Sequence, residues 1–262
     1  MGVKAVKLYQ DATNYEGIGV MVLVNGLPII ADNTSGHGTG GELLNPYLLN
    51  EVNHITIILT PLKSAPLPSE RASVSVKVLE TNPGDDGKPS ATGTAYKFEW
   101  KQRQPPVHAP SPVNGTLPPV RPPQPLNWQD APRTPPSQAD RAEINAQIKR
   151  FHDALEAKDV AQVGPLLSSK AENYARSLGQ SMPSLETSLR QSFEEDFSDP
   201  HWRMRPINYE HLQYHAGAGG RVVHVLNPDG SEPLRSLPDS NSGTTSFSLY
   251  LARVNGHWVF VI

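Results

Sequence analysis

The glycine-rich stretch Gly36–Gly41 is the first place where this chain could do chemistry. It matches the pattern G-x-G-x-x-G, which places a pyrophosphate at the N-terminus of a helix. That chemistry needs a strand before the glycines and a helix after them, whereas Pro46 follows closely and the flanking runs alternate like antiparallel strands. No G-x-S-x-G nucleophile elbow occurs in the sequence, so a lipase-type oxyanion loop is excluded. We interpret the stretch as a loop of an all-β region.

The two histidines His211 and His215 are spaced as i and i+4, which would chelate a metal ion on a helix. The segment Ile207–Leu212, however, has the pattern of a strand. On a strand, four residues span roughly 13 Å, which is too far for one ion. We therefore expect no metal site and no cofactor.

The stretch His201–Pro206 alternates Trp202 and Met204 with Arg203 and Arg205. Two interpretations stay open. If the stretch is exposed, an aromatic and arginine patch of this kind favours a protein interface. If it is buried, Trp202 and Met204 belong to the core and the arginines form its rim.

The composition excludes several classes of function. The formal net charge is −3, and Lys and Arg form no cluster longer than two residues, which argues against a nucleic-acid partner and a basic membrane helix. Cysteine is absent, so disulfides, thiolate zinc sites and a Cys nucleophile are excluded. Apolar runs such as Gly19–Val24 are too short to span a membrane. We expect a periplasmic protein if Met1-Gly2 follows a removed signal peptide, and a cytoplasmic one otherwise.

Proline marks the division of the chain. Twelve of the 26 prolines fall between Pro105 and Pro136, and proline resists both helix interiors and sheet ladders. We predict an extended linker over residues 104–136, between an N-terminal domain of residues 1–103 and a C-terminal domain of residues 137–262. Leu126 and Trp128 near the end of the linker are expected to dock on the domain that follows.

The first domain has the pattern of short strands. Val74, Val76 and Val78 repeat with period two, and Asn25-Gly26 is typical of a two-residue hairpin turn. Further strands are predicted at Val3–Leu8, Gly19–Val24, Leu27–Ile30, Ile55–Leu59 and Tyr96–Trp100. The region therefore predicts an antiparallel β-sandwich of the general bacterial Ig-like or jelly-roll kind.

The second domain begins with helical periodicity. Ser137 and Asp140 form a helix-start motif, and apolar residues at spacings of three and four predict a helix over about 138–157. Shorter helices are expected at 160–167, interrupted by Pro165, at 170–179 and at 184–197. The period then drops to two, which predicts strands over Pro206–His215, Arg221–Leu226, Thr244–Val254 and His257–Ile262.

This order of elements resembles the NTF2-like superfamily, also called SnoaL-like or cystatin-like α+β. The resemblance rests on Phe151, Ala154, Leu155 and Asp159 in the first long helix, and on Gly256 and Trp258 in the last hairpin. It implies a conical α+β roll, and it carries a fold rather than one function. The expected fold class is α+β overall, with a sandwich followed by this roll.

A conical sheet of this family can hold a general acid or base, or a small ligand. The residues that could serve as acid, base or supporting carboxylate are Tyr174, Tyr209, His211, His224, Tyr250, Asp196 and Asp199. The alternative is that large side chains such as Phe193, Phe197, Phe247 and Trp258 fill the cone. We single out as candidate ligand or partner contacts Tyr174, Trp202, Arg203, Arg205, Tyr209, His211 and Tyr250.

Neither domain shows a complete set of catalytic residues. The sequence favours a non-catalytic binding protein of bacterial type, an accessory or immunity protein that recognises a protein or envelope partner. An enzyme or a small-ligand binder that uses the C-terminal cone is the alternative. A weaker hypothesis is carbohydrate binding by the first domain, which would need exposed, coplanar Tyr47 and Trp100.

Overall fold

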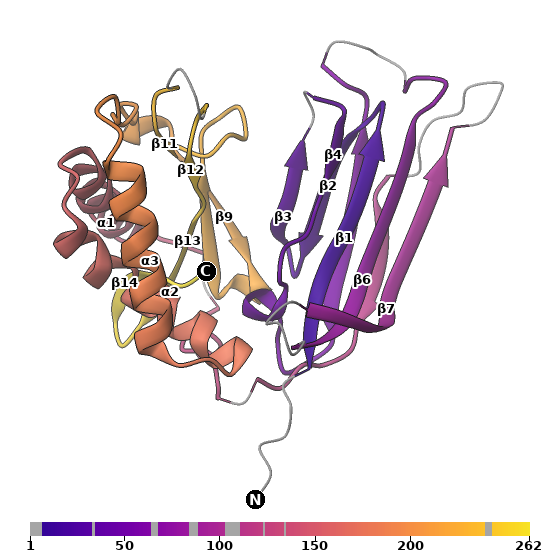
Figure 1. Cartoon of the computed structure of the whole chain (residues 1–262), viewed down its shortest axis with the longest axis horizontal. Coiled ribbons are helices and arrows are strands. Elements are labelled where there is room, and N and C mark those ends of the chain that lie inside the picture. The colour runs from indigo at the N-terminus through magenta and orange to yellow at the C-terminus, as the bar shows by residue number, and fades with distance from the viewer. Residues whose placement is uncertain are drawn as a thin grey trace, which may run out of the picture. The chain divides into compact units, whose positions relative to one another are not determined.

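The fold combines antiparallel sheets with α-helices and is therefore α+β (Figure 1). The computed structural model describes residues 7–32, 35–63, 68–83, 89–102, 111–122, 124–133, 135–238 and 243–262. The chain forms two compact units, Met1–Pro123 and Gln124–Ile262. In the described residues, no helix combines the length and the apolar character needed to cross a membrane.

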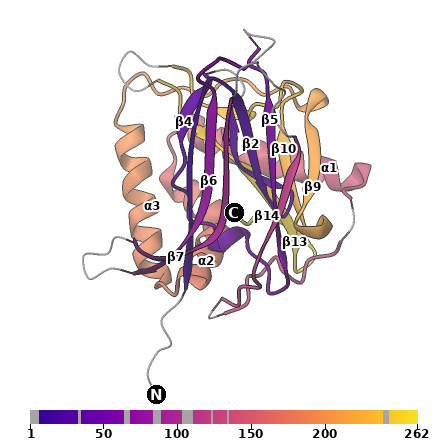
Figure 2. The ribbon, with the colours of Figure 1, turned by 90° about the vertical axis from the view of Figure 1, so that its right-hand side faces the viewer.

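The first unit contains two four-stranded antiparallel sheets, with strand orders β4-β1-β6-β7 and β3-β2-β5-β8. The axes of the strands in both sheets are roughly aligned and stand close to vertical in Figure 2. The first sheet comprises β1 (Leu8–Glu16), β4 (His37–Thr39), β6 (Ser73–Pro83) and β7 (Pro89–Lys101). The second comprises β2 (Gly19–Val24), β3 (Leu27–Asp32), β5 (Asn53–Thr60) and β8 (Val113–Leu117).

Alternation explains why these segments form half-buried strands. In β6 the residues Val74, Val76 and Val78 are buried while their neighbours are partly exposed. The hairpin of β2 and β3 turns at Asn25-Gly26, both with positive φ (53° and 77°), which confirms the predicted turn. The glycine-rich stretch predicted as a loop includes the short strand β4, paired with β1.

Part of the predicted linker 104–136 is structured. The proline-free run between Pro112 and Pro118 forms β8 (Val113–Leu117), which pairs with β5. Leu126 and Trp128 are fully buried, as the prediction that they dock on the C-terminal domain requires. The proline-rich composition therefore does not make the whole segment a spacer, because the residues between the prolines supply both ladder hydrogen bonds and core side chains.

A buried asparagine fixes the end of this segment within the second unit. The side chain of Asn173 accepts a hydrogen bond from the Asn127 backbone N–H at 2.8 Å and donates to the carbonyl of Val261 at 3.0 Å. One buried amide thus joins residues 124–133 to the second helix and to the chain end. The predicted division into domains of residues 1–103 and 137–262 stays a prediction.

The second unit packs three helices against a sheet of order β14-β13-β10-β9. The helices are α1 (Gln138–Glu156), α2 (Val160–Leu178) and α3 (Met182–Phe197). The sheet strands are β9 (Gln213–Gly217), β10 (Val222–Leu226), β13 (Leu249–Val254) and β14 (His257–Phe260). A separate two-stranded sheet pairs β11 (Leu234–Arg235) with β12 (Ser246–Phe247).

The first helix confirms its sequence signature. Ser137 and Asp140 form a reciprocal capping box at its N-terminus. By contrast, the interruption predicted at Pro165 is wrong, because α2 runs unbroken to the C-cap Gly179, whose φ is 66°. Buried Val163 and Leu167 on either side of Pro165 hold the helix against the core, which offsets the local cost of the proline.

The predicted strand Pro206–His215 is also wrong for most of its length. Tyr209–His211 form a 3₁₀ turn, and β9 starts only at Gln213. The preceding segment instead docks on α1: the indole of Trp202 donates to the carbonyl of Leu155 at 2.9 Å. The backbone of this segment forms only an isolated antiparallel bridge, between Met204 and Ser236, so it does not continue as a strand into β9.

Candidate functional site

The space between the helices and the sheet of the second unit is filled by aromatic side chains. Phe151 lies 5.2 Å from Phe260 and 5.6 Å from Phe247, centroid to centroid, and Phe193 stacks on Phe247 at 6.1 Å. Phe197 meets Trp202 edge-on at 5.4 Å. These rings occupy the interior that a conical sheet would otherwise offer to a ligand.

The stretch His201–Pro206 shows the buried pattern. Trp202 and Met204 belong to the core, whereas Arg203 is exposed and Arg205 is half-buried. The guanidinium of Arg203 donates to the carbonyl of Trp202 at 2.8 Å. Trp202 thus offers little surface for the partner contact predicted for it, and the two arginines line the rim.

Tyr209 and His211 follow on the same segment. Tyr209 is half-buried, and burial, with a smaller contribution from the charge of Asp153, raises the pKa of its phenol to about 12. A phenol with so high a pKa stays protonated near neutral pH and is a poor general base. His211 is exposed on the 3₁₀ turn.

The remaining predicted contacts lie on other elements. Tyr174 is half-buried on α2, with the ammonium of Lys170 5.9 Å from its ring centroid. Tyr250 on β13 is buried and stacks on His224 of β10 at 4.3 Å. The seven residues therefore spread over α2, the 201–211 segment and β13, and we find no common surface for them.

His224 and Glu232 form the arrangement closest to an acid–base pair. The Nε2 atom of His224 lies 3.1 Å from Oε1 of Glu232. In the described part of the chain, Nδ1 of His224 and Oε2 of Glu232 are buried without a hydrogen-bond partner. His224 is only 2% exposed, so a substrate would reach the imidazole only if the neighbouring residues moved.

The structure bears on three further predictions: a supporting carboxylate at Asp196, a metal site and carbohydrate binding. Burial raises the pKa of Asp196, and the neighbouring charge of Glu195 adds to this effect. Among the described residues, no group of three His, Asp or Glu side chains is placed to hold a metal ion. Tyr47 is 6% exposed, so it cannot form the exposed aromatic pair with Trp100 that carbohydrate binding would need.

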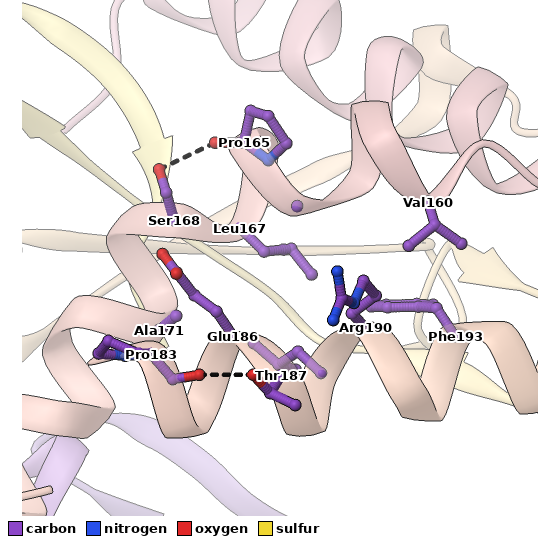
Figure 3. A pocket seen from close by; sticks show the side chains of 12 residues that line it. Val160, Pro165, Leu167, Ser168, Ala171, Pro183, Glu186, Thr187, Arg190 and Phe193 are labelled. Atoms are coloured by element: carbon purple, nitrogen blue, oxygen red, sulfur yellow. Dashed lines mark hydrogen bonds between the residues drawn. The ribbon is translucent and has the colours of Figure 1, made fainter. Parts of the chain in front are cut away.

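An open pocket lies instead between α2 and α3, which we call the α2–α3 groove (Figure 3). Its volume is about 440 Å³. Val160, Leu167, Ala171, Leu189 and Phe193 give it apolar walls. The remaining lining residues are Gly164, Pro165, Ser168, Pro183, Glu186, Thr187 and Arg190.

Polar groups gather at the rim of this groove. Glu186 and Arg190 reach from α3 toward α2 in Figure 3. The hydroxyls of Ser168 and Thr187 donate to carbonyls one turn back in their own helices, at 2.9 and 2.8 Å. These hydroxyls are thus engaged with the backbone. Of the two charged side chains at the rim, Arg190 also forms an exposed ion pair with Glu194 at 3.9 Å, which it can exchange for a ligand at little cost.

The groove exists because α3 approaches the core only at its C-terminal end. Phe193 and Phe197 are its buried residues, whereas Leu185 and Leu189 are half-buried. On the opposite wall, Gly164 has no side chain, and a Cβ atom placed there would meet no described atom within 4 Å. The missing side chain at Gly164 and the absence of buried residues in the N-terminal part of α3 together leave the groove open.

Sequence reasoning missed this groove, although one signal was present. Gly164 and Pro165 are adjacent poor helix formers inside a helix, with costs of about 1 and about 3 kcal/mol relative to alanine. Local conflicts of this kind are typical of functional or strained positions. The sequence pattern was interpreted only as an interruption at Pro165, without Gly164.

Comparison of the chain with protein-family models, curated proteins and solved structures gave no match. The resemblance to the NTF2-like superfamily therefore stays a prediction.

Proposed function

We propose that the chain is a non-catalytic binding protein, of the accessory or immunity type, that recognises a protein partner through the α2–α3 groove. One observation carries the proposal. The interior that could hold a substrate is filled by packed rings, whereas a pocket of about 440 Å³ with apolar walls opens between two surface helices.

The groove suits the side chains of a protein partner. Its apolar walls favour a leucine- or phenylalanine-sized group, whose burial contributes about 1.5–3 kcal/mol. Glu186 and Arg190 at the rim bear opposite charges, so the rim selects polar neighbours of that anchor rather than a strongly charged molecule. Such a contact acts as the central anchor of a larger interface.

The finer fold assignment belongs to the same proposal. We infer that the first unit is an antiparallel β-sandwich and the second an NTF2-like roll. The order of three helices followed by an antiparallel sheet supports the second assignment. The hydrogen bond of 3.0 Å from the Tyr15 hydroxyl on β1 to Asp32 on β3 joins the two sheets and supports the first.

Site-specific photo-crosslinking in the cells that express the protein tests the function. A photoreactive residue at Thr187 faces the groove, whereas Ser188 is exposed and does not line it. We expect one dominant adduct from position 187 that is absent from position 188. Gly164→Trp, which fills the groove, should abolish that adduct. The same adducts from both positions, or adducts that survive Gly164→Trp, would contradict the proposal.

A further inference from the structure

Among the described strands of the first unit, β7 is the longest that lies at the edge of a sheet. It has 13 residues and lies at the end of the strand order β4-β1-β6-β7, with β6 as its one strand neighbour in the described part of the chain (Figure 1). The other edge strands are shorter: β4 has three residues, β8 has five and β3 has six, one of them Pro28. An open edge presents backbone N–H and C=O groups to another strand.

The two faces of β7 differ in chemistry. Tyr96, Phe98 and Trp100 pair with the buried valines of β6 and are themselves half-buried. Lys97, Glu99 and Lys101 occupy the other face and are exposed. The strand therefore carries an incompletely covered aromatic row beside a row of alternating charge.

Among the antiparallel registers, the one centred on Phe98 is the most self-complementary, because centring the pair on Trp100 also sets Glu99 opposite Lys101 but leaves Phe98 opposite Gln102. When Phe98 lies opposite Phe98 of a second copy, Lys97 lies opposite Glu99, and Tyr96 opposite Trp100. Centring the pair on Lys97 or on Glu99 opposes like charges. A shift by one residue places a lysine opposite an aromatic ring on the same face. Within one copy, Glu99 already meets Lys97 at 3.0 Å and Lys77 at 3.7 Å, but these exposed pairs can exchange partners at little cost.

We propose that β7 is a homodimerisation edge, and that two copies of this chain pair their β7 strands antiparallel about a two-fold axis at Phe98. The pairing joins two four-stranded sheets into one continuous sheet. It also places the aromatic rows of the two copies side by side on one face, where cross-strand contacts bury part of each row. Lysines on an edge strand usually oppose such pairing, but here Glu99 between Lys97 and Lys101 turns the charges into an attractive pattern.

Sedimentation equilibrium with charge variants tests the proposal. We expect the native chain to dimerise and Glu99→Lys to weaken the dimer by about tenfold or more, because two attractive cross-strand pairs become repulsive. The double variant Lys97→Glu/Glu99→Lys restores opposite charges and should restore the dimer. A monomeric native chain, or a dimer that Glu99→Lys leaves unchanged, would overturn the proposal.

The register itself is tested by disulfide trapping, which is clean because the chain has no cysteine. In the proposed pair, Phe98→Cys meets its own copy across the axis, whereas Tyr96→Cys does not. We expect oxidation to link Phe98→Cys into a dimer and to leave Tyr96→Cys monomeric on a non-reducing gel. The reverse pattern, or equal linking of both variants, would contradict the register.

Discussion

The helices α1 and α3 of the second unit have similar lengths but pack very differently. Along α1, the stripe Ile144, Ile148, Phe151, Ala154 and Leu155 is buried from the second turn to the last. Along α3, burial is confined to Phe193 and Phe197 in the last two turns. An amphipathic helix normally hides its whole apolar stripe. The half-buried leucines of α3 therefore mark surface that the fold does not use for its own core.

The N-terminus of α1 is also anchored to the sheet by polar contacts. Asp140 accepts hydrogen bonds from the Trp258 indole at 3.1 Å and from the Arg253 guanidinium at 2.6 Å. At the corresponding end of α3, Ser181 makes no side-chain capping hydrogen bond. The helix α1 therefore stabilises the unit along most of its length, whereas the N-terminal part of α3 leaves half-buried leucines outside the core.

The largest expected effect comes from Trp258, which lies beneath α1 and is 5% exposed. Trp258→Ala should cost about 3–5 kcal/mol, because it removes a core aromatic and the hydrogen bond to Asp140. Urea denaturation followed by far-ultraviolet circular dichroism measures this, since the described helices belong to the second unit. Trp258→Phe, which keeps most of the packing, serves as the control. An unchanged unfolding midpoint for Trp258→Ala would show that this face is not core.

A matched pair of truncations compares the two helices directly. Ile148→Ala on α1 should cost about 2–5 kcal/mol, because it leaves a cavity at a fully buried site. Leu189→Ala on α3 should cost less than about 1 kcal/mol, because the leucine is half-buried beside the groove. The same denaturation experiment applies. Equal losses would erase the distinction between α1 and α3.

The pH dependence of stability tests the anchoring of α1. Hydrogen bonds from Ser137 and then from Trp258 lower the pKa of Asp140 to about 2, from an ordinary value of 3.8. Because the folded pKa is depressed, this stabilisation is fully present above about pH 4 and is lost as the pH falls toward 2. Asp140→Asn should flatten that loss and cost about 1 kcal/mol at neutral pH, as caps do. A loss of equal steepness in Asp140→Asn would assign the acid sensitivity to other groups.

The smallest effect has the opposite sign. Gly164→Ala should raise the free energy of unfolding by about 0.5–1 kcal/mol, because Gly164 lies inside a helix and its Cβ position is open. Gly115→Ala is the control, since its Cβ would collide with the Tyr96 ring, and it should destabilise. A destabilised Gly164→Ala would mean that the groove wall is already closed.

Local pattern predicted much of this fold. The helices α1 and α3, the β2–β3 hairpin and the strand β14, which contains Trp258, all follow from periodicity, capping and turn residues close in sequence. Strand β1 was missed beyond Leu8, because its buried face carries Asp11 and Thr13. The Thr13 hydroxyl donates a hydrogen bond of 2.7 Å to Oδ1 of Asp11, whereas Oδ2 finds no partner among the described residues and burial raises the pKa of Asp11 to about 6. Buried polar residues on a strand break the apolar alternation that prediction needs.

The groove could not be predicted in the same way. It depends on the angle at which α3 leaves the core, and that angle is set largely by the contact of Phe193 with Phe247, which lies far along the chain. The burial of Trp202 likewise depends on the hydrogen bond from its indole to the carbonyl of Leu155 on α1. The spacing of residues in the sequence predicts neither the angle of α3 nor this hydrogen bond.

Isothermal titration of a peptide selected against the native chain from a random library tests the central claim most directly. The account predicts that Gly164→Trp weakens binding by about tenfold or more, because the buried anchor side chain loses its pocket. Ser188→Trp, on a side of α3 that does not line the groove, should leave the affinity unchanged. Peptides that bind native protein and Gly164→Trp equally well would contradict the assignment of the α2–α3 groove as the binding site.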